Sequence, residues 1–143
     1  MQLYSKHTAW TVAVAVVGTV LVGSSLLAAA QKTTKEGVFS AEQVKRGEAL
    51  YKEQCASCHS ADLSGGGAPQ LAGADFLGFW DKTPVSDLVV KIKDTMPASS
   101  PGSLNKAQAV EITTFILSAN KFPTGSADLS QDDAALKAVV IAK

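Results

Sequence analysis

Hydrophobic side chains recur at helical spacing in three parts of the chain. The clearest stripe follows the i, i+3, i+4, i+7, i+8 pattern of a helix with one buried face, and it consists of Ala109, Ile112, Thr113, Ile116 and Leu117. Asn105 and Gln108 precede the stripe as a capping box, and Asn120 with the later Pro123 ends it. We therefore expect a helix over residues 105–120.

A second helix is predicted to begin at Ser40. Gln43 lies three residues further on, which completes the capping-box pattern. Gly47 lies inside this helix, where a glycine costs about 1 kcal/mol relative to alanine. A close crossing with another helix would explain that glycine, and Tyr51 falls one turn later on the same face.

A third helix is predicted from Pro84, at the first helical position, to about Thr95. The stretch 61–73 lies between the helix that begins at Ser40 and the helix that begins at Pro84. It is rich in glycine and has no periodicity, so it is predicted to be a loop. The aromatic stretch 76–80 follows and is predicted to form part of the core. The sequence thus predicts an all-α fold with three main helices and long loops.

The N-terminal stretch differs in kind from the rest. Lys6 precedes a long hydrophobic run that ends in three alanines at Ala30. This order is typical of a secretory signal peptide over 1–30, cleaved after Ala30, and an uncleaved membrane anchor is the alternative. Residues 31–39 are predicted to be a flexible leader. The tail, residues 124–143, is predicted to be either a short helix or strand on the domain or a disordered end.

Charge adds little to this picture. The chain has 13 basic and 13 acidic side chains, and cleavage after Ala30 would remove one lysine, Lys6. A near-neutral chain with interspersed signs gives no support for nucleic-acid binding.

Two cysteines enclose two small residues in the stretch Cys55-Ala56-Ser57-Cys58-His59. This spacing indicates covalent attachment of a c-type haem, with the adjacent imidazole as an iron ligand. A thioredoxin-like pair would need a βαβ setting, and a zinc site would need four ligands from a chain with two Cys and two His. A structural disulfide across this gap would close a tight, strained ring. Export agrees with the haem interpretation, because c-type attachment takes place outside the bacterial cytoplasm.

A second iron ligand is predicted from an inventory of side chains. Apart from Met1, Met96 is the only methionine of the chain, and His7 would leave with the signal peptide. A haem with one His and one Met ligand can then be built only from His59 and Met96. Pro97 prevents the preceding helix from continuing and holds Met96 in extended backbone. The alternative is a methionine that only fills space in the core.

Two further contacts with the haem are predicted from single residues. Carbonyl groups near Pro69 are candidates to accept a hydrogen bond from Nδ1–H of His59, which would orient the ring. The indole N–H of Trp80 needs a partner when buried, and a haem propionate is a suitable acceptor.

Together these residues resemble a class I c-type cytochrome with one haem. The resemblance covers about residues 40–123, the predicted cytochrome c domain, and implies thioethers at Cys55 and Cys58. It implies iron ligands at His59 and Met96 and a Pro69 carbonyl that holds the proximal histidine.

A narrower resemblance rests on four motifs. These motifs are similar to those of small cytochromes found with periplasmic quinoprotein dehydrogenases. They are the haem motif with its following Ala-Asp-Leu, the Ala-Pro-x-Leu-x-Gly loop with Leu71, the Phe-x-x-Phe-Trp stretch with Trp80, and Thr-Met-Pro. This implies that Leu71 and Trp80 also belong to the haem-binding set.

These features predict a periplasmic electron carrier rather than an enzyme. It would pass single electrons from a dehydrogenase toward a terminal oxidase or another cytochrome, through contacts near Ala68, Pro97 and Ala98. Two alternatives stay open. One is a fixed cytochrome subunit of a dehydrogenase complex. The other is a peroxidase or gas-binding protein, which requires that Met96 does not ligate the iron.

Overall fold

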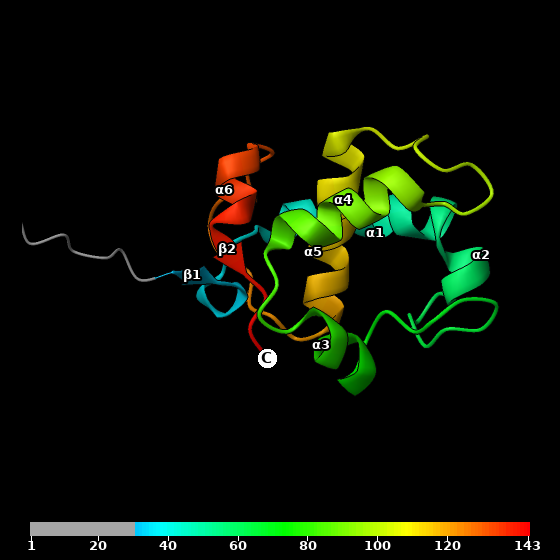
Figure 1. The fold of residues 1–143 in the computed structure, drawn as a ribbon, viewed down its shortest axis with the longest axis horizontal. Helices are drawn as coiled ribbons and strands as arrows, with labels where there is room; N and C mark the ends of the chain where they lie inside the picture. The colour runs from blue at the N-terminus through cyan, green and yellow to red at the C-terminus, as the bar shows by residue number, and fades with distance from the viewer. Residues whose placement is uncertain (1–30) are drawn as a thin grey trace, which may run out of the picture.

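The computed structural model describes residues 31–143, and the predicted signal peptide or anchor over 1–30 lies outside the described residues. The described part is mainly helical, which confirms the all-α prediction (Figure 1). In chain order its elements are β1 (Lys32–Thr33), the short 3-10 helix η1 (Thr34–Glu36), α1 (Ala41–Gln54), α2 (Ala56–His59), α3 (Ala74–Trp80), α4 (Val85–Thr95), α5 (Lys106–Ala119), α6 (Asp133–Lys137) and β2 (Val139–Val140). Within residues 31–143 no helix is both long enough and hydrophobic enough to cross a membrane.

The crossing of α1 with α5 is the centre of the fold, and it is as close as Gly47 predicts. A Cβ atom at Gly47 would lie 1.9 Å from the backbone oxygen of Glu111 and 3.1 Å from Cβ of Phe115. One turn further along α1, the ring of Tyr51 packs against that of Phe115 with centroids 5.0 Å apart. Both helices therefore meet through backbone and aromatic surface.

The predicted helix starts are largely confirmed. The Asn105 side chain accepts from the Gln108 N–H, and the Gln108 side chain accepts from the Asn105 N–H, which makes a complete capping box. Ser40 also caps its helix, by accepting from the Gln43 N–H. Pro84 is the capping residue of α4 rather than its first helical residue, because its backbone is extended.

The prediction for the Gln43 side chain is wrong in one respect. Instead of folding back on Ser40, its amide bonds both backbone groups of Leu129, donating to the carbonyl at 3.1 Å and accepting from the N–H at 2.6 Å. The Gln43 side chain is buried and therefore joins α1 to the tail.

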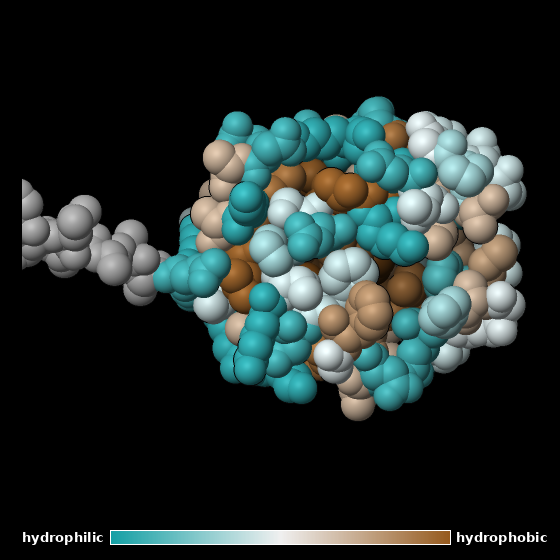
Figure 2. Space-filling model, viewed as in Figure 1, coloured by the Kyte–Doolittle hydropathy of each residue, from teal (hydrophilic) through white to brown (hydrophobic). Residues whose placement is uncertain are grey.

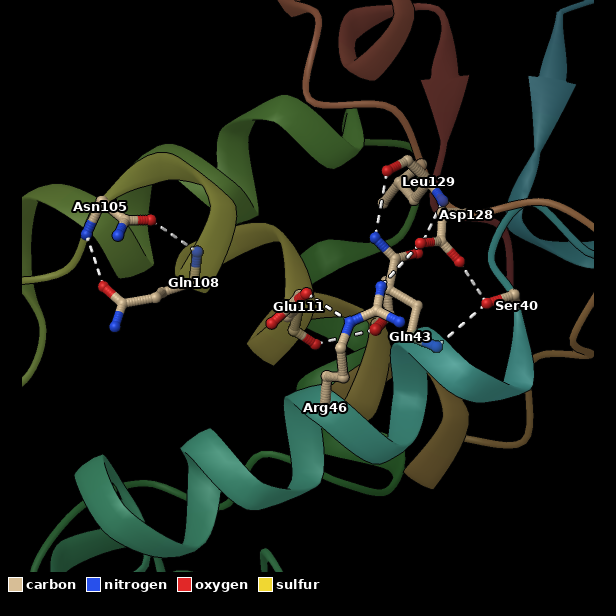
Figure 3. A network of polar contacts seen from close by, with 9 residues as sticks. Ser40, Gln43, Arg46, Asn105, Gln108, Glu111, Asp128 and Leu129 are labelled. Atoms are coloured by element: carbon tan, nitrogen blue, oxygen red, sulfur yellow. Dashed lines mark hydrogen bonds and ion pairs between the residues drawn. The ribbon is translucent and has the colours of Figure 1, made fainter.

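Charged groups reinforce this junction (Figure 3). Arg46 donates to the carboxylate of Glu111 on α5 and to that of Asp128 in the tail, each at 2.6 Å. Asp128 also accepts a hydrogen bond from the Ser40 hydroxyl. The network thus links the start of α1, the middle of α5 and the tail.

The prediction that residues 31–39 are a flexible leader is contradicted. β1 pairs in parallel with β2 of the tail, with Lys32 opposite Val139, and Phe39 is completely buried in the core. Burial of hydrophobic side chains such as Val38 and Phe39 is the physical reason for this order. The tail, left undecided by the sequence, forms α6 and β2 and covers the same end of the domain (Figure 1).

The tail also holds the connection between α3 and α4. The N–H of Lys82 donates to the Ile141 carbonyl at 2.8 Å, and the N–H of Ile141 donates to the Thr83 carbonyl at 2.9 Å. Ile141 is completely buried. The helix α3 itself was missed by the pattern of hydrophobic residues, which predicted only that its aromatic residues belong to the core.

Candidate functional site

A hydrophobic cavity of about 780 Å³ opens between α2, α3, α4 and α5. This is within the size range of small-molecule and cofactor pockets, about 300–1,000 Å³. All seven site residues predicted from the sequence line it, namely Cys55, Cys58, His59, Pro69, Leu71, Trp80 and Met96. The fold therefore brings residues that are far apart in the chain into one place, although what each of them binds stays a prediction.

The haem-attachment motif begins where α1 ends. The N–H of Cys55 closes the last turn of α1 on the Tyr51 carbonyl at 2.9 Å, and α2 then turns the motif back so that the His59 N–H reaches the Cys55 carbonyl at 3.0 Å. Cys55 is partly buried and Cys58 is exposed. Before a haem is attached, burial raises the pKa of the Cys55 thiol to about 11.

His59 is buried, and the loop that follows it fixes the direction of its ring. Its Nδ1 lies 2.8 Å from the Pro69 carbonyl oxygen, the contact that the sequence predicts. A carbonyl can only accept, so Nδ1–H donates this hydrogen bond, and in the neutral ring Nε2 is then the nitrogen with the free electron pair. His59 is thereby prepared to act as a metal ligand through Nε2.

Backbone hydrogen bonds hold this loop in shape. The N–H of Ala68 donates to the Cys58 carbonyl and the N–H of Gly65 donates to the His59 carbonyl, both at 3.1 Å. Gly65 has a φ of +89°, which a residue with a side chain rarely adopts, and a Cβ there would lie 2.9 Å from the Ala68 oxygen. The loop keeps Pro69 beside His59 because it closes on the haem motif itself.

Met96 follows directly after α4. Its N–H makes the last bond of the helix, to the Ile92 carbonyl at 3.0 Å, and its backbone is extended, with φ −122° and ψ 153°. The prediction that the helix stops before Met96-Pro97 is confirmed. The thioether side chain lines the same cavity as the His59 ring.

The remaining walls are hydrophobic. Leu88 and Ile92 come from α4, and Ile112 and Ile116 come from the stripe of α5. The aromatic residues of α3 also line the cavity, and Phe76 is buried in the core as predicted. The prediction that the whole stretch 76–80 belongs to the core is wrong for Phe79, whose side chain lies at the cavity but is 76% exposed, because α3 is a short helix on the surface of the domain. In Figure 2, hydrophobic side chains show inside the hollows of the visible face, and hydrophilic side chains surround them.

Asn120 has a role that the sequence did not predict. It ends α5 as expected, but its side chain also donates to the Leu71 carbonyl at 2.9 Å and accepts from the Gly73 N–H at 3.0 Å. These two bonds fasten the loop that carries Pro69 and Leu71 to the end of α5. The pattern that predicts Asn120 as the end of a helix does not predict that its side chain bonds Leu71 and Gly73, which lie much earlier in the chain.

A polar rim of the cavity was also missed, formed by Gln54, Ser57, Asp75 and Lys91. Their polar side chains fall at helix and turn positions that the sequence pattern assigns to solvent. Ser57 lies inside the haem-attachment motif, but no motif separates Gln54, Asp75 and Lys91 from other surface residues.

The donor set fits a c-type haem better than a metal ion alone. Two thiols, one imidazole with a free Nε2 and one thioether share a cavity with otherwise hydrophobic walls, as a flat hydrophobic ring with a central iron requires. Across residues 31–143 no group of three or more His, Cys, Asp or Glu is placed to hold a metal ion.

Comparison with known families agrees with this chemistry. Residues 42–116 match the model of a family described as cytochrome C oxidase, cbb3-type, subunit III. Comparisons with curated proteins and with solved structures gave no match. Because the family match covers more than half of the chain, the protein belongs to this family and is a class I c-type cytochrome, a haem electron carrier with covalently bound haem c.

Proposed function

We propose that the protein is an exported, periplasmic electron carrier that takes single electrons from a dehydrogenase and passes them toward a terminal oxidase. The candidate donor is a quinoprotein dehydrogenase. In this proposal Cys55 and Cys58 hold the haem, and His59 and Met96 are its iron ligands. The observation that carries it is the presence of all four side chains in one hydrophobic cavity.

When bound, the haem supplies one-electron chemistry at its iron. The protein's own residues determine what else can happen there. The Pro69 carbonyl accepts from Nδ1–H of His59, which orients the ring and leaves Nε2 of the neutral imidazole as the nitrogen that can bind the iron. Met96 offers a soft thioether, and thioether ligation raises the reduction potential of the iron. With both ligands supplied by the chain, substrates such as oxygen and peroxide have no free position, which favours a carrier over a catalyst.

The hydrophobic walls serve the same purpose. Leu88, Ile92, Ile112 and Ile116 surround the cavity with hydrophobic surface, and a hydrophobic environment around the iron disfavours the more highly charged oxidised state and raises the potential further. A high potential suits a carrier that accepts electrons from a dehydrogenase.

Support for export comes from the sequence. The hydrophobic run that ends at Ala30 has the order of a signal peptide, and haem attachment to a Cys-x-x-Cys-His motif occurs outside the bacterial cytoplasm. Mass spectrometry of the purified holoprotein gives the mature N-terminus. A chain that begins at Gln31 is expected, and a retained Met1 would favour the anchored form.

The ligand set is tested by replacing Met96 with alanine. The oxidised parent protein is expected to show the far-red absorption band of a sulfur–iron bond. M96A should lose that band, keep the covalent haem and show a lower reduction potential. Ile92→Ala also enlarges the cavity but removes no sulfur, so it is the matched control and should keep the band.

The opposite result has a clear meaning. A parent protein that lacks the band, and that binds carbon monoxide rapidly when reduced, would have a free iron position. It would then be a gas-binding or peroxidase-type protein rather than a six-coordinate carrier.

A fixed subunit of a larger redox complex is a second candidate. The description of the matched family, which names an oxidase subunit, favours it. Purification from native membranes and from the periplasmic fraction separates the two, because a subunit remains with large partners and a carrier is recovered alone. Finding a dehydrogenase rather than an oxidase among those partners would identify the dehydrogenase-subunit alternative.

A further inference from the structure

The hydroxyl of Tyr51 bonds the backbone of the residue that directly follows the haem-attachment motif in sequence. Tyr51 is completely buried at the α1–α5 crossing, and its hydroxyl donates to the Ser60 carbonyl at 2.7 Å. The His59 carbonyl lies 3.3 Å from the same hydroxyl. Packing against Phe115 requires only the ring of Tyr51, so the hydroxyl needs a separate explanation.

Ser60, the residue that this hydroxyl holds, has an unusual backbone. Its φ of 65° and ψ of 153° lie in a region that is occupied almost exclusively by glycine. Such a conformation costs free energy in a residue with a side chain and persists only where its surroundings enforce it. Besides the bond from Tyr51, the Ser60 hydroxyl donates to the Gly65 carbonyl.

The strained residue lies where the chain must turn sharply. His59 ends α2, and the chain has to reverse within a few residues so that Pro69 can return to the ring of His59. The Gly65 N–H, which bonds the His59 carbonyl, belongs to the same reversal.

We propose that Tyr51 is a positioning residue for His59, acting through the strained backbone of Ser60, so that α1 holds the backbone of the histidine while Pro69 holds its ring. The inference rests on the proposed function in that His59 is taken as the iron ligand. It adds a residue outside the cavity to the groups that determine how the imidazole is presented.

Tyr51→Phe keeps the ring and removes the hydroxyl. Thr113→Val is the matched control, because it removes another buried hydroxyl, whose hydrogen bond to the Ala109 carbonyl at 2.8 Å stays within α5. Both variants are prepared as holoprotein with covalent haem.

Hydrogen exchange is the first measurement. In Tyr51→Phe, the amides of His59, Gly65 and Ala68 should exchange about fivefold faster than in the parent, which corresponds to one net hydrogen bond of about 1 kcal/mol. The amide of Ile116 on α5 is the internal reference and should be unchanged. In Thr113→Val the three loop amides should keep the parent rates.

Two further measurements separate positioning from general destabilisation. The NMR shifts of the haem methyl groups in the oxidised protein depend on the orientation of the axial imidazole, and they should change in Tyr51→Phe but not in Thr113→Val. In a Ser60→Gly background the strain is absent, so Tyr51→Phe should accelerate loop exchange less than it does in the parent.

The proposal is overturned if Tyr51→Phe accelerates the loop amides no more than Thr113→Val does, or if Ile116 is accelerated equally. It is also overturned if the haem methyl shifts are unchanged. The sulfur–iron band of the parent protein reports on the proposed ligand set independently. If the parent protein shows this band but the loop amides exchange no faster in Tyr51→Phe, the positioning role of Tyr51 is rejected and the proposed ligand set still stands.

Discussion

Gly47→Ala tests the closeness of the α1–α5 crossing. The added Cβ would lie 1.9 Å from the Glu111 oxygen and 2.7 Å from its carbonyl carbon. Ordinary contacts of this kind are 3.4 Å or longer, so the two helices would have to separate by about 1.5 Å at this point. The obstacle is backbone, which cannot rotate away as the end of a side chain can.

Two opposing terms determine the size of the effect. Overpacking a well-packed contact costs about 1–3 kcal/mol, and a clash with backbone belongs at the upper end of that range. Replacing a helical glycine by alanine returns about 1 kcal/mol of helix propensity. We therefore expect Gly47→Ala to destabilise the protein by about 2 kcal/mol, which lowers the melting temperature of a domain of this size by about 8 °C.

Thermal unfolding of the holoprotein, followed by circular dichroism, measures this shift. Gly78→Ala is the matched control, because Gly78 also lies inside a helix but a Cβ there meets nothing within 4 Å. That variant should be as stable as the parent or more stable by up to about 1 kcal/mol. If Gly47→Ala melts together with Gly78→Ala, the crossing is not as close as described.

Two predictions concern the tail. Gln43→Ala leaves the buried N–H and carbonyl of Leu129 without partners, at about 1–3 kcal/mol each, so limited proteolysis should cut the tail sooner than in Lys45→Ala, which loses an exposed ion pair. Equal digestion would contradict the role of Gln43. The hydroxyl of Ser40 and then Arg46 lower the pKa of Asp128, so its stabilising contribution is present above about pH 4 and is lost as the pH falls through the lowered pKa. Asp128→Asn should flatten the acid side of the stability profile, and an unchanged profile would refute this.

The sequence predicted those parts of the site that depend on local pattern and on residue inventory. The haem motif is recognisable by its spacing, and Met96 was predicted as a ligand because few other ligand side chains are available. The structure places both in one cavity. The helices around α1, α4 and α5 followed from periodicity and capping residues, and Gly47 pointed to the close crossing.

The parts that were missed depend on partners far away in the chain. Phe39 is completely buried, and its carbonyl accepts from the N–H of Gly125 in the tail at 2.7 Å. The mixed, mostly polar sequence of residues 31–39 does not show these distant partners, so it did not predict an ordered segment. Gln43 had a local partner available in Ser40 and bonds Leu129 instead. The direction of the Asn120 side chain toward Leu71 and Gly73 is equally a matter of tertiary structure.

The pairing of β1 with β2 bears on the order of folding. It pairs Lys32 with Val139 and thus closes a loop that contains nearly all described residues. Loop-closure entropy grows with the enclosed length, and contacts between distant residues form late. The ends of the chain should therefore come together last, after α1 and α5 have crossed and the cavity lined by Cys55, Cys58 and Met96 has formed, since neither β1 nor β2 lines that cavity.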